Sequence, residues 1–381
     1  MVYKYDLEKI KTPAFICDID LLIENLKFHR KLTEDCNCRL LFSLKTFTII
    51  EILKYIQKYV DGFSASSLFE TKIARELLND AQSIHITTPG LKKGEISEIS
   101  ELGQYIAFNS ISQYKNLKNN LNQNSEIGFR INPQFSSNID RRYNPCCKNS
   151  KLGISIKDFV EYINKNDSDF ISGIHFHTNC DSTDFKFLVG TFNIIENNLQ
   201  DFLYKIKWIN LGGGYLFSNS EQIQIFQNLI RKIKTKYNLE VYIEPGASLI
   251  RNSFSLVSSV LDIFNSDNKD VVILDTTVNH LPEVLEFNYK LNINNSSHFA
   301  QYEYIIAGSS CLAGDLFGKY KFDKQLQIGD KIIFNNVGAY SIVKANMFNG
   351  INLPAIYIND KQNGLKLIKE YSYKDFISKY D

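Results

Sequence analysis

The chain has 381 residues, which is long enough for a barrel plus a second, smaller domain. Its 43 basic and 42 acidic side chains leave a formal net charge of +1, so no electrostatic footprint for a nucleic-acid polymer or an anionic membrane is expected. The apolar runs are too short to span a bilayer, and the charged first residues hold no signal core. Seven cysteines without CxxC spacing favour free thiols in a reducing cytoplasm.

From about residue 18 to residue 244, short β-rich runs alternate with longer amphipathic stretches. The runs expected to be strands are Leu40–Leu44, Gly62–Ala65, Ile84–Thr87, Tyr105–Phe108, Ile127–Ile131, Gly173–His177, Trp208–Leu211 and Glu240–Glu244. Helical patterns between them include Thr48–Tyr59, Leu68–Leu78 and Ile223–Tyr237. Eight strand–helix repeats predict an α/β fold of the (β/α)8 barrel type rather than an open doubly wound sheet.

After Pro245 the pattern changes to strands with few helices between them. These runs are Val257–Phe264, Val271–Asp275, Glu303–Ala307, Lys331–Asn335 and Ala355–Ile358. The opening Pro13–Ile19 is also strand-like and is expected to pair with this region. We therefore predict a barrel at residues 20–247 and a β-domain formed by residues 1–19 and 248–381.

Barrel enzymes build their active sites from the C-terminal ends of their strands, and unusual residues fall at such ends here. Lys45 closes an apolar strand. It is either a lysine that snorkels into water or a desolvated lysine of lowered pKa that forms a Schiff base. Gly212–Gly214 directly follow another strand. They form either a common tight turn or a turn whose backbone N–H groups meet a phosphate.

A pair of histidines ends a further strand. His175 and His177 share one face of that strand, and Cys180 and Asp181 follow, which is a pattern that a metal-dependent barrel hydrolase would use. No second strand end is rich in histidine, so no metal is expected. The other interpretation is an imidazole that stacks on a flat cofactor ring.

Two more residues admit both a structural and a chemical interpretation. Glu244 either caps a turn or faces a pyridine nitrogen, whose protonation would make the ring a strong electron sink. Cys311 lies in a loop with two glycines and a carboxylate. It is either an inert buried thiol or the donor of the proton that replaces a lost carboxylate.

Taken in this order, these pieces resemble the fold-type III pyridoxal-5′-phosphate (PLP) decarboxylases, the group of ornithine and diaminopimelate decarboxylases and alanine racemase. Within that group they look most like the carboxynorspermidine decarboxylases, over nearly the whole chain. The matching stretches are Lys11–Ala14, Ser43–Phe47, Phe108–Ser110, Tyr143–Cys146, Ser150–Gly153, Gly173–His177, Gly212–Gly214, Glu244–Gly246, Cys311–Asp315, Ala339–Tyr340 and Phe348–Pro354.

The resemblance implies PLP as the cofactor, held in a barrel that carries an alanine racemase-like β-domain. Lys45 would bind the cofactor covalently, His177 would stack on its ring, and Glu244 would pair with its pyridine nitrogen. The phosphate would be held by Gly212, Gly213, Gly214, Gly246 and Tyr340.

The resemblance also implies a homodimer with shared active sites, in which Cys311 and Asp315 reach into the partner's site. Cys311 would then act in catalysis together with Lys45 and His177. The candidate contacts with the substrate are Asp315, His280 and Cys180. A non-catalytic PLP-binding protein is the alternative from another class, and the β-domain residues argue against it.

The substrate is suggested by two departures from the carboxynorspermidine decarboxylases. After the last barrel strand those decarboxylases have a sequence like Glu-Pro-Gly-Glu-Ala, whereas this chain has Ala247 in place of the second glutamate. The run Thr277–Pro282 also lacks a glutamate that they carry. The desolvated cationic tail of a polyamine would want such acids. We therefore expect a 3-amino-3-carboxypropyl head on an anionic nucleotide, as in maturation of the peptide-nucleotide antibiotic microcin C. The alternative is carboxynorspermidine or carboxyspermidine in polyamine synthesis.

Overall fold

A computed structural model describes residues 7–136 and 144–381 of the chain. Tyr143 of the stretch Tyr143–Cys146 and the first six residues of the expected β-domain lie outside this description. The chain divides into one unit formed by Leu26–Leu249 and another formed by Met1–Asn25 together with Ile250–Asp381. The sequence analysis placed the corresponding boundaries of the barrel at residues 20 and 247.

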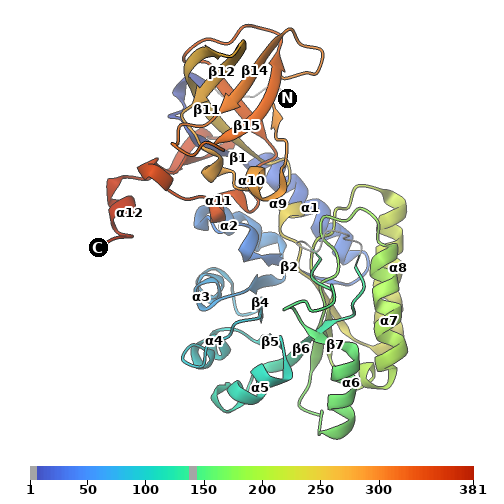
Figure 1. Cartoon of the computed structure of the whole chain (residues 1–381). Helices are drawn as coiled ribbons and strands as arrows, with labels where there is room; N and C mark the ends of the chain where they lie inside the picture. Colours follow the sequence, from blue (N-terminus) through green and yellow to red (C-terminus); the bar gives the residue numbers. More distant parts are fainter. Residues whose placement is uncertain (1–6, 137–143) are drawn as a thin grey trace. The chain divides into compact units, whose positions relative to one another are not determined.

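The unit Leu26–Leu249 is built on a barrel of eight parallel strands (Figure 1). Around the ring these are β2 (Arg39–Ser43), β3 (Gly62–Ala65), β4 (Ser83–Thr88), β5 (Tyr105–Phe108), β6 (Glu126–Asn132), β8 (Gly173–His175), β9 (Trp208–Asn210) and β10 (Glu240–Ile243). The ring closes because β2 pairs with both β3 and β10. The (β/α)8 prediction is therefore confirmed.

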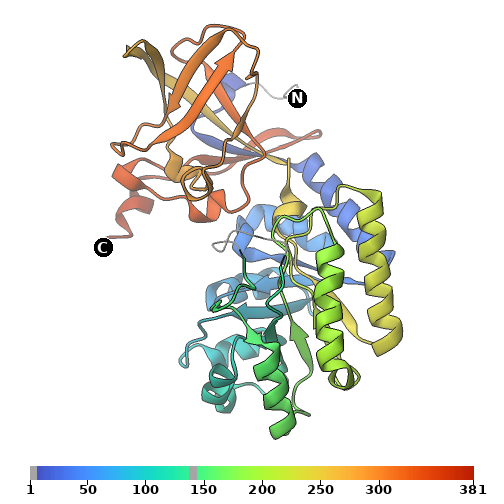
Figure 2. The ribbon, with the colours of Figure 1, turned by 45° about the vertical axis from the view of Figure 1, so that its right-hand side comes forward.

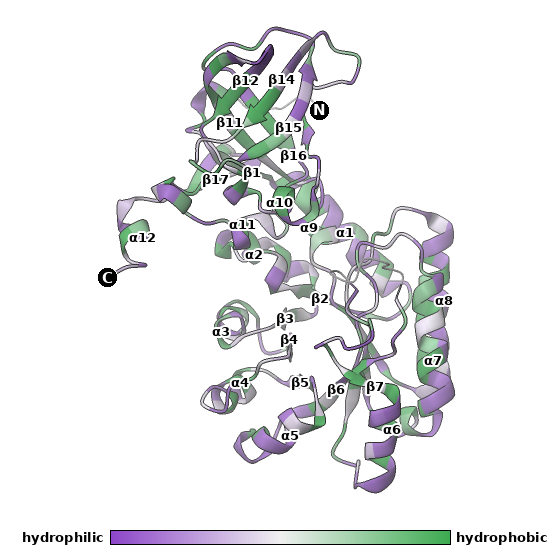
Figure 3. Cartoon of the chain, in the orientation of Figure 1, coloured by the Kyte–Doolittle hydropathy of each residue, from purple (hydrophilic) through white to green (hydrophobic). Residues whose placement is uncertain are grey.

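Helices follow the barrel strands and lie outside them (Figure 1). They are α2 (Ile50–Ile56), α3 (Leu68–Leu77), α4 (Ile96–Leu102), α5 (Ile111–Leu117), α6 (Ile156–Lys165), α7 (Lys186–Leu203) and α8 (Ser220–Tyr237). Several begin at a polar cap, as where Ser67 accepts the amide of Glu70 at the start of α3. Helices α7 and α8 lie side by side in Figures 1 and 2 and carry both polar and apolar stretches in Figure 3.

The element boundaries differ from the predictions where the chain approaches the strand ends. The strand expected at Gly173–His177 ends at His175, so His177 lies in the following loop. The helix expected at Thr48–Tyr59 begins at Ile50 and finishes as a 3-10 turn, because Ile49 keeps an extended backbone. A two-residue strand, β7 (Ile154–Ser155), pairs with β6 outside the ring and was not expected.

The other unit contains a mixed sheet, whose strands carry green, apolar stretches in Figure 3. Its central strands are β1 (Ala14–Asp18), β11 (Phe254–Ser266), β12 (Lys269–Leu274), β14 (Tyr302–Ala307), β16 (Lys331–Asn335) and β17 (Ala355–Asp360). Strand β1 pairs with β11 and with β17, so the N-terminal strand is part of this sheet. The unexpected strands are β13 (Asn292–Ile293), β15 (Leu316–Phe322) and β18 (Gly364–Lys369).

None of the helices within residues 7–136 and 144–381 combines the length and the apolarity that crossing a membrane requires.

Candidate active site

Lys45 follows strand β2 directly, in a 3-10 turn formed by Leu44–Thr46. Both neighbours of Lys45 are buried, and the Thr46 hydroxyl donates to the Ser43 carbonyl at 2.7 Å, so the turn is anchored on both sides of the lysine. The Lys45 side chain itself is exposed. Desolvation by the surrounding protein nevertheless lowers the pKa of its ammonium, and the charge of Arg130 lowers it further, against the opposing charge of Glu244. A lysine of lowered pKa is a better nucleophile at neutral pH.

Glu244, directly after β10, is buried and bonded to residues of three other barrel strands. Its Oε1 lies 2.9 Å from Nε2 of His175, and its Oε2 lies 3.4 Å from Nδ2 of Asn210. The hydroxyl of Ser64 also bonds the carboxylate. Burial alone would raise the pKa of Glu244, but the electrostatic interaction and hydrogen bond with His175, the charge of Lys45 and the bond from Ser64 outweigh it and hold the pKa well below its usual range. Glu244 is therefore an ionised carboxylate.

His177 lies against the glycine turn that follows β9. Its Nδ1 accepts the amide N–H of Gly213 at 3.0 Å, so the proton of the neutral ring sits on Nε2. Burial lowers the pKa of His177 well below its usual value, and the charges of Lys45 and Arg130 act in the same direction. A neutral, half-buried imidazole with a fixed orientation results, which suits stacking on a flat ring.

Each glycine of the turn is required by the protein around it. Gly212 and Gly214 have φ of +72° and +82°, which favour glycine. A Cβ on Gly212 would lie 2.7 Å from Nδ1 of His177, and one on Gly213 would lie 2.5 Å from the carbonyl oxygen of Glu244. The amide of Gly212 donates to Asn210 and that of Gly213 to His177. Two of the three amides are thus engaged within the protein, and the phosphate role expected of all three stays a prediction.

The sequence did not reveal the part that several residues take in this centre, although Arg130 and His175 stood out as unusual residues at strand ends. Asn210 bonds both Glu244 and the glycine turn, and the only signal for it is its place two residues before Gly212. His175 was considered as a metal ligand, whereas its Nε2 bonds Glu244. Arg130, in β6 two residues before its end, is buried beside this network.

The strand-end residues fit PLP as the group that they would hold. Both polar atoms of the Asn179 side chain are buried and have no bonding partner within residues 7–136 and 144–381, and the Asn179 backbone lies against Gly214. A buried amide without partners indicates a polar group that belongs next to it. An exposed lysine of lowered pKa, a neutral imidazole and a buried carboxylate lie at the same end of the strands. These are the groups that a phosphorylated pyridine aldehyde uses.

The loop Gly308–Asp315 of the other unit holds two further candidates. Cys311 is exposed, and its amide donates to Oδ1 of Asn349 at 2.9 Å. Asp315 is buried within its own unit. Its Oδ1 accepts the Val278 amide at 2.7 Å, and its Oδ2 accepts the Ser310 amide at 2.9 Å. Asp315 thus ties this loop to the turn around Val278, and its contact with a substrate stays a prediction.

The three remaining candidates have different surroundings. His280 is fully buried, its Nδ1 lies 2.9 Å from the Thr276 hydroxyl, and its Nε2 has no partner among the described residues. Burial lowers the pKa of His280 to about 4. Tyr340 has φ of +63° and its ring lies 5.5 Å from Nζ of Lys344. Cys180 is exposed. Their roles toward phosphate or substrate stay predictions.

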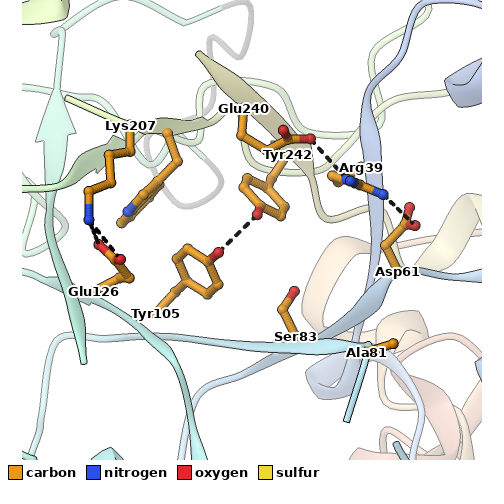
Figure 4. A pocket seen from close by; sticks show the side chains of 10 residues that line it. Arg39, Asp61, Ala81, Ser83, Tyr105, Glu126, Lys207, Glu240 and Tyr242 are labelled. Carbon is orange, nitrogen blue, oxygen red and sulfur yellow. Dashed lines mark hydrogen bonds and ion pairs between the residues drawn. The ribbon is translucent and has the colours of Figure 1, made fainter. Parts of the chain in front are cut away.

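A separate pocket of about 410 Å³ lies at the opposite, N-terminal ends of the barrel strands (Figure 4). Its charged residues pair with one another: Arg39 with Glu240 at 2.9 Å and Lys207 with Glu126 at 3.0 Å. The hydroxyls of Tyr105 and Tyr242 bond each other as well. This end of a barrel ordinarily serves stability, and the paired charges agree with that.

The metal-binding interpretation lacks a ligand set in the part of the chain that the structure describes. Residues 7–136 and 144–381 hold no group of three His, Cys, Asp or Glu side chains placed to bind one ion. Nε2 of His175 bonds Glu244, and Nδ1 of His177 accepts the amide of Gly213.

Comparison with known proteins gives the family. Residues 21–251 match the model of the pyridoxal-binding domain of pyridoxal-dependent decarboxylases. The carboxynorspermidine/carboxyspermidine decarboxylase of Campylobacter jejuni is 34% identical, over 97% of this chain and 98% of that protein. The enzyme of the same name from Herminiimonas arsenicoxydans is 32% identical, over 97% and 99%.

Solved structures agree with the sequence matches. The crystal structure of carboxynorspermidine decarboxylase from C. jejuni, complexed with norspermidine, has a TM-score of 0.87 and 32% identity, covering 97% of this chain and all of that one. Diaminopimelate decarboxylase from Helicobacter pylori, with a TM-score of 0.84 at 21% identity over 98% of each chain, shares the fold. The chain belongs to the pyridoxal-dependent decarboxylases and is a PLP-dependent carboxy-lyase.

Proposed function

We propose that this enzyme removes the α-carboxylate of carboxynorspermidine or carboxyspermidine and so makes a polyamine. The observation that carries the proposal is the whole-length similarity to two carboxynorspermidine/carboxyspermidine decarboxylases, at 34% and 32% identity. A third relative, the carboxyaminopropylagmatine decarboxylase of Synechocystis, is 29% identical over 97% of this chain. By their names, all three act on a carboxylated aminopropyl group with a basic tail.

These relatives favour the polyamine substrate over the nucleotide-linked one that the missing acids suggested. The inference rested on the missing acids at Ala247 and in Thr277–Pro282, with Asp315 and Glu283 or Glu286 recognised as acids that could compensate. Both glutamates lie in helix α10 (Glu283–Phe287), close in sequence to the run that lacks its glutamate.

The two α10 acids differ in what they bond. Glu286 pairs with Lys344 at 2.5 Å and is neutralised within the protein. Oε1 of Glu283 is buried and has no partner in the described part of the chain. Burial raises the pKa of Glu283 and outweighs the bonds from its own backbone amide and the Ser341 hydroxyl and the charge of Lys344, so the carboxylate has no full countercharge. An ammonium of the substrate tail would supply that charge, so Glu283 is the acid that we assign to the tail.

The chain's own residues have separate tasks in the reaction. When bound, PLP supplies the electron sink that makes loss of CO2 from Cα feasible. Lys45 would hold the cofactor, and its lowered pKa makes its amine available as a nucleophile near neutral pH. His177, fixed by the Gly213 amide, would lie against the cofactor ring, and Glu244, fixed by His175, would keep the pyridine nitrogen protonated. The Cys311 thiol delivers the proton to Cα.

The test of the substrate is a direct comparison of kcat/KM. Purified enzyme loaded with PLP is offered carboxynorspermidine, carboxyspermidine and the 3-amino-3-carboxypropyl nucleotide conjugate, and released CO2 is measured. We expect at least one of the polyamine precursors to exceed the nucleotide conjugate by about 100-fold, since an unpartnered buried charge costs several kcal/mol. A higher kcat/KM for the nucleotide conjugate would overturn the proposal.

We further propose a homodimer whose active sites combine Lys45 of one subunit with Cys311 of the other. An isologous dimer creates two equal sites of this kind. Mixing the inactive variants Lys45→Ala and Cys311→Ala should restore activity, up to about a quarter of the wild-type value at random exchange. The heterodimers are half of the molecules and hold one complete site of two. No recovery despite demonstrated subunit exchange would contradict a shared site.

A further inference from the structure

Glu244 is held by three donors that come from three different strands. Nε2 of His175, the last residue of β8, lies 2.9 Å from Oε1, and Nδ2 of Asn210, the last residue of β9, lies 3.4 Å from Oε2. Ser64 in β3 donates its hydroxyl. A carboxylate has about four acceptor positions. Three donors therefore leave about one position for a further N–H, which is the number that a protonated pyridine presents.

The protonation of His175 follows from which of its nitrogens has a partner. Nε2 faces Glu244, whereas Nδ1 is buried and has no partner in the described residues. A proton on Nδ1 would bury an unbonded N–H donor, which costs about 1–3 kcal/mol. That state arises both in the Nδ1–H tautomer and in the imidazolium. Only the neutral ring with its proton on Nε2 avoids it.

The electrostatic surroundings of His175 favour the same state. The imidazole is about 1% exposed, and burial lowers its pKa. The charges of Arg130 and Lys45 also disfavour an imidazolium, and only Glu244 favours it. The other ring nearby, His85, is itself neutral because burial lowers its pKa to about 3.

We propose that His175 is a positioning residue for the decarboxylation, which as a neutral Nε2–H imidazole fixes the Glu244 carboxylate in place and weakens it as a base. The proposal rests on the assignment of Glu244 to the cofactor nitrogen. A carboxylate that accepts several hydrogen bonds gives up less of its charge to a further proton. A proton shared between Glu244 and the cofactor nitrogen would then stay on the nitrogen. His175 thus acts through Glu244 and touches neither substrate nor cofactor.

The protonation state can be measured without cofactor or substrate. The chain has six histidines, so the ring nitrogens of 15N-histidine-labelled, cofactor-free protein can be resolved by NMR and His175 assigned by its absence in His175→Gln. We expect the Nε2–H tautomer, unchanged from pH 6 to pH 8. An imidazolium or an Nδ1–H tautomer would overturn the proposal. This result is independent of which substrate the enzyme uses, so it separates the inference from the proposed function.

The effect on catalysis is tested by two substitutions and one control in the loaded enzyme. His175→Leu removes the donor, His175→Gln keeps an N–H donor of similar reach, and His298→Gln repeats that change on an exposed histidine. We expect His175→Leu to lower kcat roughly 10- to 100-fold with KM little changed, as for loss of a residue that orients a ligand. His175→Gln should recover most of this loss, and His298→Gln should match wild type.

The pH profile supplies a readout that a merely structural role would not change. Removal of the His175 donor raises the pKa of Glu244, while the charges of Lys45 and Arg130 and the neutral rings of His177 and His85 stay. The acid limb of kcat should therefore shift to higher pH in His175→Leu and return in His175→Gln. Equal behaviour of the two variants, or an unshifted acid limb, would overturn the proposal.

Discussion

Substitution of Gly246, two residues after Glu244, should disturb Lys45, because Gly246 packs against Thr46, the residue that follows the lysine. A Cβ on Gly246 would overlap Oγ1 and Cγ2 of Thr46 and lie 2.9 Å from its Cβ. Thr46 is buried and follows Lys45, so it moves only if the turn that carries Lys45 moves. Overpacking of this kind costs about 1–3 kcal/mol. A displacement of about 1 Å at a reacting group costs on the order of 100-fold in rate.

The structure also predicts that Thr46→Ala partly rescues Gly246→Ala. Thr46→Ala alone loses the hydrogen bond to Ser43, worth about 1 kcal/mol, together with a buried methyl group. In the double variant both overlapping atoms are gone and only the Cβ contact of 2.9 Å remains. The double variant should therefore be more stable than the sum of the single changes by about 1–2 kcal/mol.

The assay is urea unfolding of the cofactor-free protein, followed by the fluorescence of Trp208, the single tryptophan of the chain, which is buried in the barrel unit. In a parallel measurement on protein loaded with PLP, the absorbance of the bound cofactor reports whether Lys45 still holds it. Gly90→Ala is the matched control, because no atom lies within 4 Å of its Cβ position. The reasoning is refuted if Gly246→Ala is as stable as Gly90→Ala, or if Thr46→Ala fails to restore stability.

Three further results are expected. Lys45→Ala should lose the visible absorbance of bound PLP, and borohydride should attach PLP to the wild-type peptide that holds Lys45 and to no peptide of the variant. The pKa of His280 is lowered to about 4, so unfolding takes up a proton, and wild-type stability should fall as the pH drops from about 6.5 toward 4. In urea unfolding, His280→Asn should weaken this fall by up to about 1.4 kcal/mol per pH unit, and an equal pH dependence would contradict the assignment. In steady-state kinetics, Glu283→Gln should raise KM for the polyamine precursor about 10-fold. Glu286→Gln should raise KM less, because Glu286 already pairs with Lys344. The reverse order would contradict the assignment of Glu283 to the substrate tail.

Local signals in the sequence were sufficient for the order of the elements. The eight barrel strands are short apolar runs whose residues are almost all buried, and such runs stand out from the amphipathic helices between them. Lys45 and Gly212–Gly214 were noticed because they interrupt or follow such runs. Strand β18 was missed because it lies at the edge of its sheet, is largely exposed and carries two lysines among its six residues.

Which side chains meet was decided only by the tertiary structure. His175 and Glu244 are 69 residues apart, and their bond exists because the ring of strands closes and brings the ends of β8 and β10 together. From the sequence, the pair His175 and His177 was weighed as a metal site, which was not expected, and as an imidazole stacked on a cofactor ring. Neither interpretation included the bond to Glu244, because an i, i+2 pair of histidines is a local pattern and a partner carboxylate is not. The same reason applies to Asp315, whose oxygens are taken by Val278 and Ser310, and to Glu283, whose oxygen is not taken. A sequence names the groups that can ionise, whereas burial and the allocation of donors, which fix their charge and their freedom to bind, arise only in the folded chain.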